Sequence, residues 1–241
     1  MQIVGKTDVG TIRESNQDAF FYDTLSEKAF FAIVCDGMGG ANAGNVASDT
    51  AVRTISEYLK RSFREGMNSM QIENIIRSAI ITANSTVFQM AQKDESLSGM
   101  GTTVVLLFVD GNTGYVFHIG DSRLYIYTSE CLNQITIDHS IVQNMIDSGK
   151  ITPDEAKNHP SKNIITRALG VNEEVNADMD IITLSENDIV LLCSDGLTNY
   201  VSEEEIANIL GSFDDTVALR LIDKANLGGG GDNITAVAVK I

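Results

Sequence analysis

Five aspartates stand where a strand-like segment or a glycine-containing turn interrupts the sequence: Asp18, Asp36, Asp121, Asp195 and Asp232. Most of them have glycine alongside, which lets backbone or ligand approach closely. A side chain at the end of a rigid central strand has little positional freedom. Carboxylates that converge from such positions repel one another strongly unless cations lie among them. The pattern therefore predicts a site for divalent cations.

The donor atoms indicate which cations this site would prefer. Carboxylate oxygens are hard ligands, which select Mg²⁺ or Mn²⁺ over zinc or copper. The three histidines, His118, His139 and His159, do not pair with one another at the sequence spacing of metal ligands, and the three cysteines are scattered. Any single Asp-Gly pair is also a common turn signal. The prediction therefore depends on the whole set of aspartates rather than on one of them.

Arg13 stands five residues before Asp18 and suggests that the cations serve phosphate chemistry. A carboxylate cluster that handles phosphate also needs a fixed guanidinium, which binds phosphate through paired N–H donors. The segment GMGGANAG, residues 37–44, leads into a helical segment whose amino end would favour anions. It lacks the Lys-Ser/Thr ending of a P-loop, so nucleotide binding by that route is excluded.

Hydrophobic periodicity predicts the elements that must position these residues. Helices are expected near residues 47–59, 72–90, 140–148, 152–155, 202–210 and 214–225, two of them with capping boxes. Strands are expected at residues 2–7, 19–23, 29–35, 102–109, 114–119, 123–128, 133–136, 180–184, 189–193 and 234–239. Short turns favour antiparallel pairing, and the helices do not alternate one per strand. A layered α+β fold follows.

Composition sets further bounds. The 241 residues contain no repeat or linker, so we expect a single domain over residues 1–241. The formal charge of −16 disfavours binding to nucleic acid or to an anionic membrane surface. No apolar run reaches the roughly 18 residues that cross a bilayer, and the N-terminus does not read as a secretory signal. We therefore expect a cytoplasmic protein, and three cysteines without close pairs agree with that.

The sequence also resembles a known family over nearly its whole length. The matching stretches occur in the family's order: TDVGTIRESNQDAF (7–20), VCDGMGG (34–40), GMGTTVV (99–105), HIGDSRLY (118–125), DHS (138–140), NHPSKNIITRALG (158–170), CSDGLTNYVS (193–202) and GGGGDNITAVAV (228–239). Any one of these stretches alone is a weak signal, whereas the ordered set is specific. The chain thus resembles the metal-dependent serine/threonine protein phosphatases of the PPM, or type-2C, family, in their bacterial branch.

This resemblance implies an α+β fold with four layers, in which two central antiparallel sheets are flanked by helices. It implies two Mn²⁺ or Mg²⁺ ions per chain at one edge of the sandwich. Asp36 would bridge both ions, the Gly37 carbonyl would bind one, and Asp195 and Asp232 would complete the other. The remaining assignments are Asp18 as the residue that holds metal-bound water, Arg13 as the phosphate-binding residue, Asp121 as a ligand of a possible third metal, and about residues 141–165 as a mobile flap.

One position departs from many eukaryotic members of the family. These have a histidine after the Asp-Gly pair, which is thought to protonate the leaving group, whereas this chain has Met38. Bacterial members commonly share this methionine, so activity is not excluded. Metal-bound water would then be the first candidate for the proton source. His139 and His159 remain alternatives, although both fit structural or flap positions as well.

The resemblance predicts hydrolysis of phosphoserine and phosphothreonine in proteins by direct attack of a hydroxide shared by two metals. The expected partners are phosphorylated proteins and an opposing bacterial Ser/Thr kinase, with no nucleic acid and no membrane, and we expect a monomer. Two alternatives stay open. One is a metal-dependent hydrolase of small phosphoesters or nucleotides, which would use the same centre. The other is a non-catalytic module with a phosphatase-like fold.

Overall fold

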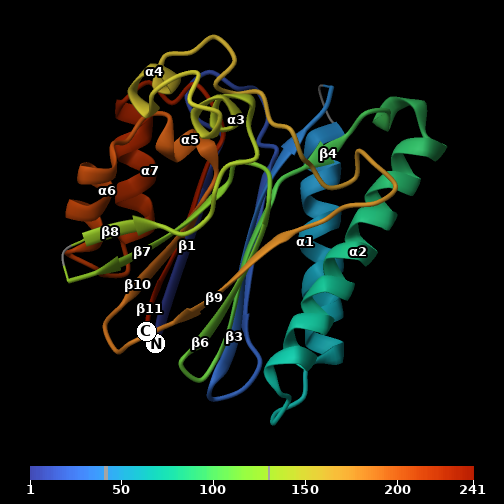
Figure 1. Ribbon diagram of the computed structural model, residues 1–241, viewed down its shortest axis with the longest axis vertical. Coiled ribbons are helices and arrows are strands. Elements are labelled where there is room, and N and C mark those ends of the chain that lie inside the picture. The colour runs from blue at the N-terminus through green and yellow to red at the C-terminus, as the bar shows by residue number, and fades with distance from the viewer. Residues whose placement is uncertain (41–42, 130) are drawn as a thin grey trace.

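Two antiparallel β-sheets pack face to face, and helices cover both outer faces of this sandwich (Figure 1). The computed structural model describes residues 1–40, 43–129 and 131–241. The order of layers is helix, sheet, sheet, helix. The four-layer α+β architecture predicted from the sequence is therefore confirmed.

The first sheet has the strand order β2-β3-β5-β6-β9, with the short β4 paired to the end of β3. All of its neighbouring strands are antiparallel. Its members are β2 (Asp18–Thr24), β3 (Ala29–Met38), β4 (Gly101–Thr102), β5 (Val104–Asp110), β6 (Thr113–Ile119) and β9 (Asp178–Thr183).

The second sheet has the order β1-β11-β10-β7-β8 and is also antiparallel throughout. It pairs the first strand of the chain with the last. Its members are β1 (Gln2–Asp8), β7 (Arg123–Thr128), β8 (Cys131–Gln134), β10 (Ile189–Cys193) and β11 (Ile234–Lys240).

The helices fall into three groups (Figure 1). The long helices α1 (Ala43–Ser62) and α2 (Ser69–Lys93) cover the outer face of the first sheet, and α6 (Glu203–Leu210) and α7 (Val217–Leu227) cover the second. At the end of the sandwich opposite the two termini lie α3 (Ile141–Asp147), α4 (Pro153–Lys157) and α5 (Asp195–Thr198). A 3-10 helix, Glu95–Leu97, follows α2.

Side-chain alternation along the strands produces three buried apolar layers. In β3, Phe31 and Ile33 pack toward α1 and α2, whereas Phe30, Ala32 and Val34 pack between the sheets. A third apolar cluster fills the space between the second sheet and the helices α6 and α7. This period of two, buried on both faces, is what a continuous apolar run in a central strand predicts.

Several local expectations hold and others need correction. The capping boxes that begin with Thr152 and Ser202 are present, and Pro153 occupies the first turn of α4. Helix α7 begins at Val217 rather than at Asp214, because the Asp214 carboxylate accepts a hydrogen bond from the Thr216 N–H and forms a turn before the helix. Helix α5 was not expected. None of the helices described here combines the length and apolar character that crossing a bilayer requires.

Candidate metal centre and active site

Strand β3 delivers Asp36 into the space between the sheets. Asp36 continues the face of β3 that carries Phe30, Ala32 and Val34, two residues apart each time. Its main chain is fixed by Thr103, whose hydroxyl accepts from the Asp36 N–H at 2.9 Å and whose N–H donates to the Asp36 carbonyl at 2.8 Å. The expectation that β3 ends at residue 35 is wrong, because the pairing of β4 extends the strand to Met38.

Gly37 follows in the same strand and is packed against backbone. Its N–H donates to the Gln17 carbonyl at 3.0 Å, and a Cβ at this position would lie 2.0 Å from the Gly44 carbonyl oxygen. Only glycine fits such a close approach. Residues 41 and 42 lie outside the described residues, so of the glycine-rich segment 37–44 the structure describes the two ends.

Asp18 lies beside Asp36 because the two residues are paired in the β2–β3 register. One carboxylate oxygen, Oδ2, accepts hydrogen bonds from the hydroxyls of Ser194 at 2.6 Å and Thr235 at 2.7 Å. The other oxygen, Oδ1, is buried and has no hydrogen-bond partner among the residues that the structure describes. Burial raises the pKa of Asp18 to about 7, against the lowering effect of the two hydroxyls. The carboxylate is therefore rigidly held with one oxygen free.

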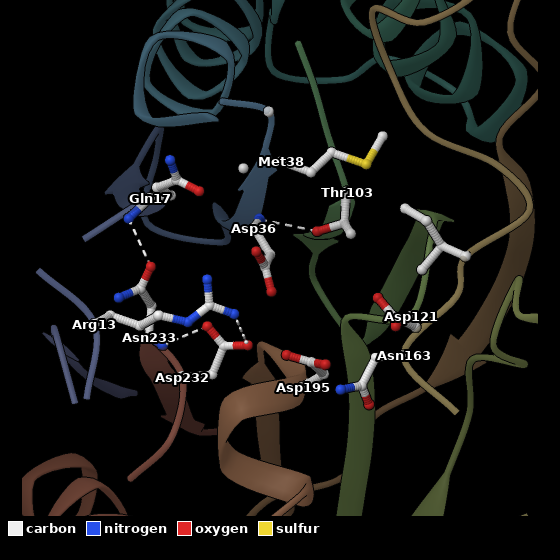
Figure 2. Close-up of a pocket in the computed structure, with 13 residues that line it drawn as sticks. Arg13, Gln17, Asp36, Met38, Thr103, Asp121, Asn163, Asp195, Asp232 and Asn233 are labelled. Atoms are coloured by element: carbon white, nitrogen blue, oxygen red, sulfur yellow. Dashed lines mark hydrogen bonds and ion pairs between the residues drawn. The ribbon is translucent and has the colours of Figure 1, made fainter. Parts of the chain in front are cut away.

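Asp195 and Asp232 reach the site from the second sheet (Figure 2). Asp195 is the first residue of α5, directly after β10, and its carboxylate accepts from the Asn199 amide at 3.0 Å. Asp232 precedes β11 and pairs through Oδ2 with the Arg13 guanidinium at 2.8 Å. Burial raises the pKa of Asp195, and the nearby charge of Asp232 raises it further.

Asp121 follows β6 and approaches from the opposite side of the cavity to Asp232 (Figure 2). The residue before it, Gly120, has a φ of +100° and packs against Thr103. Asp121 is 9% exposed, and burial, reinforced by Asp195, raises the pKa of its carboxyl to about 8. Burial followed by the surrounding aspartates raises the pKa of Asp36 well above its usual value as well.

One cavity brings these side chains together. Among the residues that the structure describes, it is lined by four carboxylates and by a single cationic side chain, Arg13. The carboxylates are those of Asp36, Asp121, Asp195 and Asp232. Buried like charges, raised pKa values and the unpartnered Oδ1 of Asp18 all indicate that the site requires added positive charge. Oxygen donors throughout make the site fit Mg²⁺ or Mn²⁺.

The cavity also contains residues that sequence reasoning missed. Thr103, Gln17 and Asn233 line it, and so do Asn163 and Ile165 from the segment expected to form the flap. The paired residues Ser140 and Ile165 form an isolated bridge at the base of that segment. These residues lie within the motifs found in the sequence. Their side chains carry no charge, however, so nothing in the sequence indicated that they line the site.

The histidines do not belong to this cavity, as far as the described residues go. Met38, which stands where many eukaryotic members of the family it resembles have histidine, lines the cavity. His159 accepts a hydrogen bond from the Ser161 N–H within the flap segment. His118 and His139, however, stack with ring centroids 4.6 Å apart, beside Asp178. His118 and His139, which show no metal-ligand spacing along the sequence, are thus brought together by the fold.

This fold and this acid-lined centre are those of a metal-dependent phosphatase, and comparison with known proteins identifies the family. The sequence profile described as protein phosphatase 2C matches residues 13–223. The chain therefore belongs to the protein phosphatase 2C family, and it is a protein phosphatase of the serine/threonine class, as its motifs predicted.

Among its relatives, the chain is 39% identical to the serine/threonine phosphatase stp of Listeria innocua over 98% of this chain and 94% of the other. It is 37% identical to the protein phosphatase PhpP of Streptococcus pneumoniae strain D39, over 100% and 98% of the two chains.

Solved structures are similar over the same length. A serine/threonine phosphatase of S. agalactiae superposes with a TM-score of 0.93 at 34% identity, covering 100% of this chain and 99% of that one. The catalytic domain of the phosphatase PstP, in complex with two manganese ions, gives a TM-score of 0.85 at 33% identity, with 99% and 97% covered.

Proposed function

We propose that this protein hydrolyses phosphoserine and phosphothreonine in proteins at a centre that holds two Mn²⁺ or Mg²⁺ ions. The observation that carries the proposal is the convergence of Asp36, Asp195 and Asp232 in a cavity with too little positive charge to balance them. The relative crystallised with two manganese ions supports it. Asp36 would be shared between the ions, with the Gly37 carbonyl on one and Asp195 and Asp232 on the other. Asp121 would hold a third, weaker ion.

Divalent ions held at this centre would supply Lewis acidity, which lowers the pKa of water toward about 7 and offsets phosphoryl charge. The proposed reaction is direct hydrolysis, in which water attacks phosphorus in line with the leaving Ser or Thr oxygen. Asp18 would orient the attacking water. Its Oδ2 is fixed by Ser194 and Thr235, so its unpartnered Oδ1 accepts the water's hydrogen bond without first having to lose another. Orientation of this kind lowers the barrier because the entropy of placing the nucleophile is lost before the reaction.

Arg13 would bind the phosphate of the substrate. Its guanidinium is half-exposed at the cavity and is anchored by Nη2 on Asp232 at 2.8 Å and by Nε on the Gly231 carbonyl at 3.4 Å, so the N–H groups of Nη1 would bind the phosphate. A guanidinium presents several donors in a fixed plane, which matches the oxygens of a phosphoryl group. Asp232 thereby orients the arginine as well as serving the metal centre.

Protonation of the leaving serine or threonine oxygen would come from water. Met38 lines the cavity but has no proton to donate. His139 is 6% exposed and hydrogen-bonded elsewhere, so it does not reach a leaving group in the cavity. Water would therefore serve both as the attacking nucleophile and as the proton donor to the leaving oxygen.

The substrates would be phosphorylated proteins, and the enzyme would oppose a bacterial Ser/Thr kinase in the same cell. We propose that it acts in the cytoplasm as a single-domain monomer, with residues 141–165 as a flap over the active site. The complete set of metal aspartates argues against a non-catalytic module.

The test is a comparison of substrates with matched metal controls. Purified protein with Mn²⁺ is offered phosphothreonine peptides, phosphoserine peptides and nucleotides, and each assay is repeated in EDTA. The proposal expects peptide hydrolysis with higher kcat/KM than nucleotide hydrolysis, and none in EDTA. Preference for nucleotides would instead indicate the small-phosphoester hydrolase. Anomalous scattering from a manganese-soaked crystal tests the ligands independently, and peaks away from Asp36 would refute the assignment.

A further inference from the structure

A second cluster of titratable side chains lies beside the metal centre, and the mechanism above does not use it. It consists of His118, His139, Arg167 and Asp178, and we refer to it as the histidine cluster. His118 and His139 are 2% and 6% exposed, and their rings stack at an interplanar angle of 23°. His118 projects from β6, where it is paired in register with Asp178 of β9.

His139 bonds to the residue that precedes Asp121 at two points. Its backbone N–H donates to the Gly120 carbonyl at 2.9 Å, and its ring Nδ1 accepts from the Gly120 N–H at 3.1 Å. The peptide groups of Gly120 are thus held on both sides. Gly120 has a positive φ, which is not a β-strand conformation, so the pairing of β6 does not hold it in place. Its conformation therefore depends on the hydrogen bonds to His139.

His139 also lies at the base of the flap segment. Its carbonyl accepts from the Thr166 N–H at 2.7 Å, one residue beyond Ile165. Ser140, which follows His139, forms the bridge with Ile165 that closes the segment. His139 therefore connects three parts of the chain: the start of the flap, which follows it, the end of the flap at Thr166, and Gly120, the residue before Asp121.

The hydrogen bonds define the protonation of the ring. Because the Gly120 N–H donates to Nδ1, that nitrogen carries the lone pair and the ring proton sits on Nε2. Nε2 therefore donates a hydrogen bond to Asp178 Oδ2 at 3.2 Å. Arg167 Nη1 also lies 3.2 Å from Nε2, but a guanidinium only donates and the lone pair of the neutral ring is on Nδ1, so this contact is not a hydrogen bond. Arg167 donates to the other carboxylate oxygen at 2.6 Å and so orients Asp178. Burial lowers the pKa of His139, which agrees with a neutral ring.

We propose that His139 is a positioning residue that fixes Asp121 and the base of the flap as one unit through the bond from Gly120 to Nδ1. Asp178 and Arg167 select the tautomer that makes this bond possible. The inference rests on the proposed role of Asp121 as a metal ligand. It predicts that loss of the Nδ1 acceptor weakens metal binding at Asp121 without affecting the two ions held by the other aspartates.

Two substitutions separate the two ring nitrogens. Asparagine at position 139 places its amide oxygen where Nδ1 stands, next to Cγ, so His139→Asn retains the acceptor for Gly120. Glutamine places its amide one bond further out, near Nε2, so His139→Gln retains a partner for Asp178 instead. Both variants keep the backbone bonds of residue 139. The pair is therefore matched in polarity and differs in which bond survives.

The primary measurement is amide hydrogen exchange followed by NMR, with Mn²⁺ titration by calorimetry. In His139→Gln the Gly120 amide should exchange about tenfold faster than in the wild type, as loss of one hydrogen bond of about 1.4 kcal/mol implies. The weakest Mn²⁺ site should weaken by a similar factor, and KM for phosphopeptide should rise more than kcat falls. His139→Asn should stay within about threefold of the wild type in each readout. Equal behaviour of the two variants would overturn the proposal.

Two further measurements keep the result interpretable. The ¹⁵N shifts of the wild-type histidines report the tautomer directly, and a proton on Nδ1 of His139 would refute the proposal even if neither variant folded. Asp121→Asn should weaken one Mn²⁺ site. If it does not, the metal role of Asp121 fails, whereas the Gly120 exchange rates still decide whether His139 positions this loop.

Discussion

The metal centre and the histidine cluster lie next to each other, and both contain buried or half-buried carboxylates. They differ in whether those carboxylates have hydrogen-bonding and positively charged partners within the protein. The cavity gathers four carboxylates and one guanidinium (Figure 2), and Asp18 Oδ1 has no hydrogen-bond partner among the described residues. In the histidine cluster, both oxygens of Asp178 accept bonds, one from His139 and one from Arg167. The cavity has too little positive charge to balance its carboxylates, whereas the carboxylate of the histidine cluster is balanced by Arg167 and hydrogen-bonded by His139.

The difference shows in the carboxylates themselves. Burial and like charges raise the pKa values of Asp36 and Asp195, whereas for Asp178 the bonds from His139 and Arg167 outweigh burial and lower the pKa. The stacked rings of His118 and His139 hold their in-plane lone pairs in two separate, nearly parallel planes, so these lone pairs do not converge on one ion. Histidine and carboxylate side chains that lie close together therefore do not by themselves define a metal site. Unbalanced charge and converging donors are also required.

The largest effect that would test this distinction is loss of Asp36. Asp36→Asn keeps the shape of the side chain but removes the charge that we propose both ions share, so kcat on a phosphopeptide should fall by about a thousandfold or more. The assay is hydrolysis under saturating Mn²⁺, with circular dichroism to verify the fold. Asp23→Asn, which removes a carboxylate of the adjacent strand that pairs with Lys60 away from the site, is the matched control and should retain activity. Near-normal turnover by Asp36→Asn would refute the metal assignment.

A second test uses the opposite pH responses of the two regions in EDTA. The folded protein holds a proton on Asp18 up to a pKa of about 7, while the unfolded chain releases it near 3.8. The native state thus binds more protons between these values, so the free energy of unfolding should fall as pH rises from about 4 to 7. The loss from this group is on the order of 4 kcal/mol.

His139 contributes with the opposite sign. Its pKa is lowered by burial, so its contribution is present above the unfolded pKa and is lost as the pH falls below it. Urea unfolding at a series of pH values separates the two, because Asp18→Asn should flatten the fall toward neutral pH and leave the acid side unchanged. A wild-type stability in EDTA that rises from pH 4 to 7 would contradict the unbalanced charge of the metal centre.

Arg13 should have a smaller effect, confined to the substrate. Arg13→Ala removes charged hydrogen bonds to phosphate, and KM should rise about tenfold to a hundredfold with a smaller change in kcat. Mn²⁺ affinity, measured by calorimetry, should remain within a few-fold of the wild type, because Arg13 contacts Asp232 but contributes no ligand atom. A collapse of metal affinity would show that Arg13 serves the metal centre instead of the phosphate.

Local sequence patterns predicted the α+β class and the candidate aspartates, whereas the four-layer arrangement and the roles of the ligands came from the family resemblance. The alternation in Ala29–Met38 places Asp36 on the same face as Val34. Asp195 and Asp232 lie outside the strands, at the start of α5 and before β11, and their positions next to glycine and close to strand ends marked them in the sequence. Capping boxes at Thr152 and Ser202 defined two helix starts for a local reason too. Boundaries were less accurate where distant pairing decides them, as with the extension of β3 by β4.

The parts that were missed depend on contacts between distant residues. Asp18 is held by hydroxyls 176 and 217 residues away, at Ser194 and Thr235. The stacking of His118 on His139 requires the loop after β8 to fold back beside β6, which no spacing rule along the chain encodes. The family motifs contained all of these residues, and also Thr7, whose hydroxyl lies 2.7 Å from that of Thr235, yet without the fold they did not show which side chains meet.

The smallest predicted effect is also the most direct comparison, because one substitution should act with opposite signs in the two regions. Asp195→Asn keeps an oxygen for the Asn199 amide and removes a buried like charge, so in EDTA it should stabilise the fold by about 1 kcal/mol. Asp178→Asn leaves one amide N–H facing a donor, either of His139 or of Arg167, and should destabilise by about 1 kcal/mol, since the site is half-exposed. Urea unfolding in EDTA measures both. Destabilisation by both variants would mean that the carboxylates of the metal centre are balanced by the protein itself, and the case for bound cations would then lose its physical basis.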